Sequence, residues 1–213
     1  MRIKRTITLL SYLIKNLTFS QFIGTIKTTL FRNQLIYVLA IDPHNLTRST
    51  SAAENHVSDS GKKVMIKKGE IEELNEFCSR TGENAWEFNC YNIDGVKDFF
   101  IAHDANVIQC IVWIYGKYDP SRLLVLREKD AILQYGLTLS QFRGRGLLPS
   151  VEIAAVRHLH RQGFQRVFVT VDSRNKASLR SQEKVGFVKV GEVRLRKVFG
   201  LQISRKLDMS QIS

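Results

Sequence analysis

The sequence has few cysteines and no cluster of metal ligands. Its three cysteines, Cys78, Cys90 and Cys110, are odd in number and far apart. This pattern lacks the pairing of a metal site and is typical of reduced, partly buried thiols in a cytoplasmic protein. Of the five histidines, His158 and His160 are only two residues apart, so on a helix they would face different directions. The sequence therefore predicts no bound metal.

No clear membrane-spanning run stands near the start of the chain. The apolar run Ile7–Ile14 follows basic residues, as in a signal peptide, but it is short, Lys15 interrupts it, and no cleavage site of small residues follows. It is also far shorter than the ~20 apolar residues that a spanning helix needs. Residues 3–32 instead fit one or two basic amphipathic helices. Such helices could lie peripherally on an anionic membrane surface, pack on a partner, or dock on the rest of the chain.

Acidic residues are absent from residues 1–41, which carry six basic side chains. Residues 42–142 carry 11 basic and 15 acidic side chains, and residues 143–213 carry 15 basic and five acidic ones. The basic C-terminal part suits a polyanionic ligand. The acidic middle would suit a cationic amine, or it is a solvated surface. No motif of interleaved aromatic and basic residues is visible, so we expect no nucleic-acid partner.

Composition divides the chain into three parts. Residues 1–45 contain the basic helical extension and a predicted strand, Leu35–Ile41, which ends at Asp42-Pro43. Residues 46–61 are rich in Ser, Thr, Asn, Asp and Gly, which is typical of a flexible linker or long loop. Residues 62–213 are expected to form the main domain.

Strands and helices alternate within the main domain. Predicted strands are 64–67, 98–103, 107–115, 123–126, 131–139, 166–172, 187–195 and 201–207. Predicted helices are 70–79, 147–162 and 176–185, and Trp86–Ile93 is ambiguous. The strands 98–103 and 107–115 would form a hairpin. The succession of strand 131–139, helix and strand 166–172 predicts a parallel crossover, with a ligand at the helix N-terminus beyond the first strand.

A glycine-rich turn lies between that strand and that helix. It reads Gln141-Phe142-Arg143-Gly144-Arg145-Gly146. Two glycines at a strand-to-helix turn let several N–H groups point one way, which makes a cradle for a phosphate group. The turn lacks the Gly-Lys-Ser/Thr of a nucleotide-hydrolase loop. It also lacks the third glycine of a dinucleotide fingerprint, because Pro149 occupies that position. A plain basic loop is the alternative.

A second motif follows the strand 166–172 and comprises Asn175, Ser178, Glu183, Lys184, Gly186 and Phe187. Together with the glycine turn, it resembles the GNAT superfamily of acetyl-CoA-dependent N-acetyltransferases. That family shows a Gln/Arg-x-x-Gly-x-Gly/Ala loop, then Asn-x-x-Ala/Ser and Tyr-Glu-Lys-x-Gly-Phe. The resemblance implies an α+β fold, with a mixed, twisted sheet whose two central parallel strands splay apart. It also implies that acetyl-CoA is the acyl donor.

The resemblance assigns donor-binding roles residue by residue. Backbone amides of the turn would hold the pyrophosphate of CoA, and these residues are Gln141, Arg143, Gly144, Arg145, Gly146 and Leu147. Main-chain groups of Leu137, Thr138 and Leu139 would bind the pantetheine and polarise the thioester carbonyl. Asn175 would contact the pantetheine arm, and Ser178 belongs to the same donor-binding motif.

The resemblance assigns the catalytic residues only in part. Gln182 stands where the family commonly has the tyrosine that protonates the leaving thiolate, and an amide cannot donate a proton in that way. Asp130 resembles by position the acidic base of histone-acetylating relatives, or it is a surface carboxylate. Glu87, Tyr135, His103 and a water chain are further candidates for the base.

The resemblance implies transfer of acetyl from acetyl-CoA to a primary amine by direct attack. The acceptor stays open among amino sugars, polyamines, antibiotics and protein amines. Gln182 favours one alternative, a non-catalytic module that binds acyl-CoA or a partner.

Overall fold

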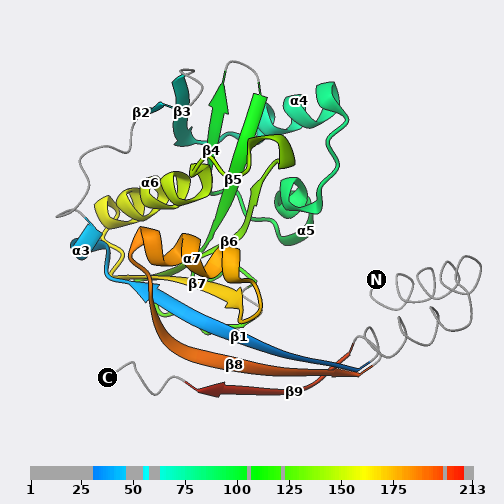
Figure 1. Ribbon diagram of the computed structural model, residues 1–213, viewed down its shortest axis with the longest axis vertical. Coiled ribbons are helices and arrows are strands. Elements are labelled where there is room, and N and C mark those ends of the chain that lie inside the picture. The colour runs from blue at the N-terminus through cyan, green and yellow to red at the C-terminus, as the bar shows by residue number, and fades with distance from the viewer. Residues whose placement is uncertain are drawn as a thin grey trace, which may run out of the picture. The chain divides into compact units, whose positions relative to one another are not determined.

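The chain divides into two compact units in the computed structural model, which describes residues 31–46, 55–57, 63–104, 107–120, 123–198 and 201–208. The larger unit is Val38–Val190 (Figure 1). The described residues of the smaller unit are 31–37, 191–198 and 201–208. No helix among the residues described is long and apolar enough to cross a membrane.

The larger unit is built on a mixed sheet with the strand order β2-β3-β4-β5-β6-β7-β1. These strands are β1 Phe31–Ile41, β2 Asn55–Val57, β3 Lys63–Lys68, β4 Phe99–Asp104, β5 Val107–Tyr115, β6 Asp130–Thr138 and β7 Arg166–Asp172, and of β1 only residues 38–41 belong to the larger unit. Neighbours from β2 to β6 are antiparallel, whereas β6 and β7 are parallel. The sheet is therefore mixed, with its parallel pair inside it.

Helices lie on both faces of this sheet. They are α3 Pro43–Leu46, α4 Ile71–Thr81, η1 Trp86–Asn89, α5 Cys90–Asp94, η2 Ser140–Phe142, α6 Leu147–Arg161 and α7 Lys176–Val185. Alternate side chains of β5 face opposite ways. Trp113 donates its indole N–H to the Glu87 carbonyl of η1 at 2.7 Å, whereas Val112 lies near Leu148 of α6 around Gly136. All of β5 except Val107 is buried, as expected for a strand covered on both faces.

The crossover from β6 through α6 to β7 forms as the sequence predicts. Leu147, Val151, Ala155 and Leu159 of α6 are buried against the sheet. Gly163 ends the helix region with a φ of 84°, a left-handed conformation that glycine adopts without strain. Figure 1 shows α7 beside α6.

In the smaller unit, β8 (Val188–Val198) and β9 (Leu201–Asp208) form an antiparallel hairpin. Its register runs from Glu192↔Asp208 to Val198↔Leu201. Val193 and Leu195 are buried and Arg194 and Arg196 are exposed, which is the alternation of a strand with one covered face. The first residues of β8 belong to the larger unit.

Several predicted elements are confirmed and one is wrong. The hairpin of β4 and β5 forms as predicted, and the ambiguous segment Trp86–Ile93 is η1 followed by α5. The predicted strand 123–126 is absent: Leu123–Leu126 is irregular, although Leu124 and Leu126 are buried. Its alternation comes from a loop that packs every second side chain inward, not from pairing with another strand.

The expected linker is partly structured. Leu46 ends α3, and Asn55–Val57 form β2, which pairs with β3 at the edge of the sheet. The rest of residues 46–61 lies outside the described residues. Most of the expected helical extension, residues 3–30, also lies outside them, whereas Phe31 and Arg32 belong to β1. Because Val38–Ile41 belong to the larger unit, β1 contributes to the sheet that we expected to begin near residue 62.

Candidate active site

The central parallel strands separate partway along their length. The register of β6 with β7 runs from Asp130↔Arg166 to Leu133↔Val169 and ends there, although both strands continue. On the other side of β6, the register with β5 jumps from Trp113↔Gln134 to Ile111↔Leu137. Tyr135, with a φ of 56°, therefore lies in a bulge, which bends the strand. The splayed central strands that the resemblance implies are confirmed.

A cleft of about 220 Å³ opens where β6 and β7 separate. Three strands and two helices contribute to its wall. The lining residues are Val112, Leu133, Gln134, Tyr135, Gly136, Leu148, Glu152, Val169, Thr170, Val171, Ser178 and Gln182. The cleft thus brings the expected site residues Ser178 and Gln182 together with β6, at the carboxyl ends of the parallel strands.

Two buried polar side chains meet in this cleft. Gln182 on α7 and Glu152 on α6 are each 3% exposed, and Gln182 Nε2 donates to Glu152 Oε1 at 2.7 Å. Within the described part of the chain, neither Glu152 Oε2 nor Gln182 Oε1 has a hydrogen-bond partner. Burial raises the pKa of Glu152 from about 4.5 to about 7, against a smaller lowering by the Gln182 hydrogen bond.

Sequence reasoning missed Glu152, although one signal pointed to it. Glu152 lies four residues after Leu148 and three before Ala155, on the stripe of α6 that packs inward. An acidic residue inside an apolar stripe is unusual, because its charge must be desolvated, neutralised or paired.

The glycine turn has the backbone geometry of an anion site. Gly144 and Gly146 have φ values of 82° and 69°, in the left-handed region. Gly146 is the N-cap of α6, and no side chain among the described residues caps this helix end. The first amides of α6 are therefore available to an anion, and the helix dipole favours one there.

The arginines of the turn fix its shape. Arg143 Nε donates to the Thr138 carbonyl at 3.1 Å, and Arg145 donates to the Gln141 carbonyl at 3.3 Å. The Arg145 guanidinium also lies 5.3 Å from the centre of the Phe142 ring. Each arginine keeps further N–H groups for an anion, so both stabilise the turn and add positive charge to it.

The residues expected to bind pantetheine lie just beyond the cleft. Leu139 N–H donates to the Gln109 carbonyl at 3.0 Å, and the Thr138 hydroxyl donates to Cys110 Sγ at 3.3 Å. Leu137 pairs with Ile111 of β5. The part of β6 that lines the cleft is Leu133–Gly136, so a pantetheine role for Leu137–Leu139 stays a prediction.

Asn175 caps a helix in the structure. Its side-chain Oδ1 accepts a hydrogen bond from Ser178 N–H at 3.0 Å, as an N-cap residue does at the start of α7. Ser178 lies in the first turn of α7 and lines the cleft. The motif Asn-x-x-Ser therefore has a local structural reason, and its contact with a ligand stays a prediction.

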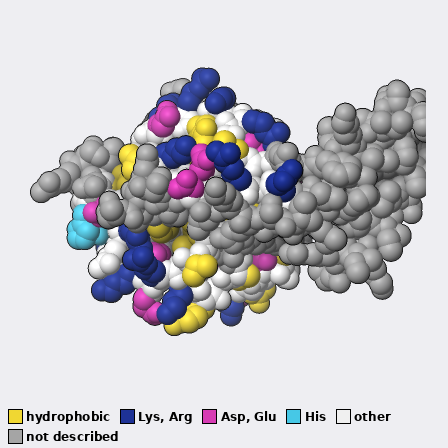
Figure 2. All heavy atoms as spheres, turned by 90° about the horizontal axis from the view of Figure 1, so that it is seen from below, with side chains coloured by type: hydrophobic (Ala, Val, Ile, Leu, Met, Phe, Trp, Pro, Cys, Tyr) yellow, Lys and Arg dark blue, Asp and Glu magenta, His cyan; other side chains and the backbone are white. Residues whose placement is uncertain are grey.

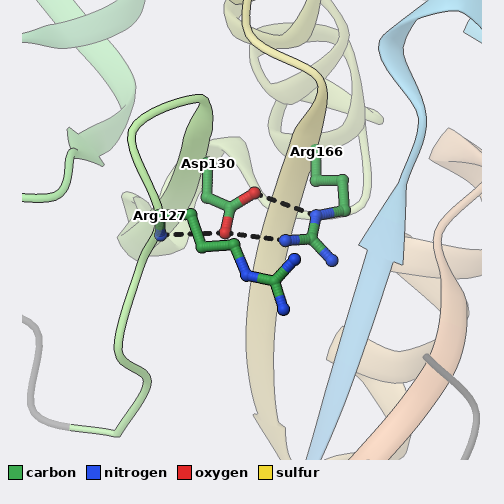
Figure 3. A network of polar contacts seen from close by, with 3 residues as sticks. All are labelled: Arg127, Asp130 and Arg166. Atoms are coloured by element: carbon green, nitrogen blue, oxygen red, sulfur yellow. Dashed lines mark hydrogen bonds and ion pairs between the residues drawn. The ribbon is translucent and has the colours of Figure 1, made fainter. Parts of the chain in front are cut away.

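Asp130 lies at the opposite end of β6 from the glycine turn. Its side chain is buried and forms a bidentate ion pair with Arg166 of β7, at 2.9 and 3.0 Å (Figure 3). The same carboxylate accepts the Arg127 backbone N–H at 2.9 Å. Asp130 is not among the residues that line the cleft, so the structure does not bring it together with Gln182.

The other candidates for the base are spread over the sheet. Tyr135 lines the cleft, and its ring packs edge-on against Trp86 at 4.6 Å and Tyr115 at 5.6 Å between centroids. Glu87 lies in η1, and His103 pairs with Ile108 at the far end of β4. Of these three, only Tyr135 is in the wall of the cleft.

Solved structures resemble this chain in fold. A GNAT-family acetyltransferase from Colwellia psychrerythraea matches with a TM-score of 0.54 at 13% identity, covering 84% of this chain and 61% of that one. A GCN5-related N-acetyltransferase from Kribbella flavida matches with a TM-score of 0.52 at 12% identity, covering 84% and 63%. The glucosamine N-acetyltransferase region of a fungal multi-domain GH3 β-N-acetylglucosaminidase matches with a TM-score of 0.54 at 16% identity, covering 83% and 22%.

The chain spans less than two thirds of the length of each of these three proteins. No protein-family model and no curated protein matches the sequence. At these identities the likeness concerns the fold, and it confirms that the chain has the mixed sheet of the GNAT acetyltransferases.

Proposed function

We propose that this chain, with its GNAT acetyltransferase fold, is an N-acetyltransferase that moves an acetyl group from acetyl-CoA to a primary amine. One observation carries the proposal. The cleft between the splayed β6 and β7 opens at the same end of the sheet as the glycine turn of α6. A narrow cleft beside an anion-binding turn suits a ligand with an extended arm and a pyrophosphate.

The donor would be held from the turn inward. Backbone amides of Arg143–Leu147 would bind the pyrophosphate, and the two arginines of the turn would add positive charge. Gln141 lies beside them in η2. Main-chain groups of β6 between Gln134 and Leu139 would hold the pantetheine. Ser178 and Gln182 would then lie beside the thioester end, because both line the cleft.

Acetyl-CoA would supply an activated acetyl group, and the protein would supply orientation and electrostatics. A main-chain N–H of β6 that points at the thioester oxygen would stabilise the developing negative charge, which is typically worth ~10²-fold or more in rate. The acceptor must arrive as a neutral amine, since a protonated amine has no lone pair for direct attack.

An amino sugar is the acceptor to test first. The fungal protein with a similar fold is described as a glucosamine N-acetyltransferase region. Beside the cleft, the exposed Trp86 packs against Tyr135, which gives a sugar ring an aromatic surface to stack on. Polyamines, antibiotics and protein amines complete the set of acceptors.

Nucleic acid is not part of the proposal. On the face in Figure 2, the Lys and Arg side chains of the described residues are dispersed, with Asp and Glu side chains between them. Nucleic-acid sites typically gather basic side chains into one stripe or patch.

Release of free thiol from acetyl-CoA tests the activity directly. We expect release that depends on an added amine, measured over a panel of amino sugars, polyamines, aminoglycosides and peptides with free amines. Acetyl-CoA binding without turnover on any amine would instead indicate a non-catalytic acyl-CoA-binding module. The presence of Gln182 in place of tyrosine is the observation that favours this alternative. If acetyl-CoA does not bind, both functions are excluded.

A further inference from the structure

The cleft holds an acid that no motif assigns. Glu152 comes from α6 and Gln182 from α7, both line the cleft, and Gln182 Nε2 donates to Glu152 Oε1 at 2.7 Å. Each is almost fully buried, yet each keeps one oxygen atom without a partner among the described residues. A buried oxygen atom without a hydrogen-bond partner costs free energy unless a ligand forms a hydrogen bond with it.

We propose that Glu152 is the general acid of the transfer, with Oε2 carrying the proton that the leaving sulfur takes up and Gln182 holding the carboxyl in place through Oε1. The inference rests on the proposed function. Glu152 is the catalytic residue in this account, because Oε2 would touch the sulfur. Gln182 is a positioning residue that acts through Glu152.

The hydrogen-bond pattern fixes where the proton sits. Gln182 Nε2 can only donate, so Glu152 Oε1 accepts and is occupied. A proton on the carboxyl is therefore placed on Oε2, the oxygen that no described residue contacts by a hydrogen bond. The pair takes over the task of the missing tyrosine, since an amide alone has no proton to give.

The surroundings keep Glu152 partly protonated near neutral pH. Burial raises its pKa to about 7, and a general acid works best when its pKa lies near the pH at which the enzyme operates. Cys110 on β5 is the titratable neighbour whose charge couples to Glu152, and burial raises its pKa to about 12, so it stays a neutral thiol. Tyr135 on β6 and Ser178 on α7 line the same cleft, and no Lys or Arg is among its lining residues.

The proton balance closes without a further reactant. Glu152 Oε2 gives its proton to sulfur as the carbon–sulfur bond breaks with its electron pair and the nitrogen–carbon bond forms. The surplus proton on nitrogen passes to water, and Glu152 regains a proton from solvent. A thiol has an ordinary pKa near 8.5, above that of Glu152, so the transfer to sulfur is downhill.

The variant Glu152→Gln tests proton transfer by Glu152 most specifically. The amide keeps the shape and can still accept from Gln182, but it has no proton to transfer. We expect kcat to fall by roughly 10²- to 10⁴-fold, with the dissociation constant of acetyl-CoA nearly unchanged. At saturating amine, kcat of the wild-type protein should fall as the pH rises through about 7, and this limb should be lost in the variant. Glu76→Gln, on the exposed side of α4, is the matched control and should leave both unchanged.

A binding measurement tests the contact with sulfur without turnover. The wild-type protein should bind CoA roughly tenfold more tightly than desulfo-CoA, because Oε2–H donates to the sulfur. Glu152→Gln should keep this preference, since its amide also donates. The double variant Glu152→Met/Gln182→Met replaces both partners by apolar side chains of similar size and should lose the preference.

The outcomes separate the two proposals. Turnover by the wild-type protein with an unchanged kcat and pH profile in Glu152→Gln overturns the role of Glu152 and leaves the acetyltransferase function standing. If the wild-type protein binds acetyl-CoA without turnover on any amine, both proposals fail. With turnover, equal affinity for CoA and desulfo-CoA overturns the contact between Glu152 and sulfur. If acetyl-CoA does not bind at all, both proposals fail.

Discussion

The buried carboxyl of Glu152 should couple the stability of the protein to pH. Its folded-state pKa of about 7 lies above the unfolded value near 4.5, so the native state binds the extra proton. The contribution to stability is therefore fully present below pH 4.5 and is lost as the pH rises through about 7. By linkage, this loss amounts to about 3 kcal/mol.

Urea unfolding of wild-type protein and Glu152→Gln at a series of pH values measures this coupling. We expect the free energy of unfolding of the variant to increase relative to that of the wild-type protein as the pH rises. Most of this relative increase should be complete by about pH 8. Parallel curves for the two proteins would show that the pKa of Glu152 is the same in the native and unfolded states.

Asp130 should act mainly through its ion pair. Replacement by Asn removes the charge that Arg166 pairs with, and the Arg166 side chain is 28% exposed, so we expect a loss of about 2 kcal/mol in the free energy of unfolding. The kcat of the folded variant should stay within about threefold of wild type, whereas loss of a catalytic base typically costs 10²-fold or more. A large fall in kcat with unchanged stability would instead support Asp130 as the base.

We propose that the turn before α6 binds the donor, and a matched pair of glycines tests this proposal. Gly144 and Gly163 have nearly equal φ values, 82° and 84°, and a Cβ on either would meet no atom within 4 Å. Replacement by Ala should therefore cost each variant about 1 kcal/mol in backbone strain. Only Gly144→Ala should weaken acetyl-CoA binding, as calorimetric titration would measure. Equal affinities in both variants would remove the turn from the binding site.

Local patterns sufficed for most elements. The helix 147–162 and the strand 166–172 were predictable because their side chains repeat at the periods of a helix and a buried strand. The strand predicted at Leu123–Leu126 is wrong for the same reason. Alternation of apolar residues shows which side chains are buried, but it does not show whether a neighbouring strand is present. β2 was missed because three residues at a sheet edge carry almost no pattern of their own.

The site was predictable only where a motif is local. Gly144 and Gly146 indicate the turn because glycine is the residue that adopts a left-handed backbone conformation without strain. The Glu152–Gln182 pair joins residues 30 positions apart on two helices, and only the packing of α6 against α7 brings them together. The ion pair of Asp130 with Arg166 depends likewise on the parallel register of β6 and β7.

At the scale of the whole molecule, we propose that the native chain binds acetyl-CoA through the turn of α6 and the cleft beside it. Thermal unfolding with and without acetyl-CoA tests this most directly, because a ligand that binds only the native state stabilises it. At about 100 times the dissociation constant, the gain is about 2.7 kcal/mol. For a chain of this size, that corresponds to a rise of roughly 5–10 °C in the melting temperature. Such a rise with acetyl-CoA, and a much smaller one with inorganic pyrophosphate, is the predicted result. No rise with acetyl-CoA well above a micromolar dissociation constant would show that the chain does not bind acetyl-CoA in this way. An equal rise with pyrophosphate alone would show that the cleft adds nothing to binding.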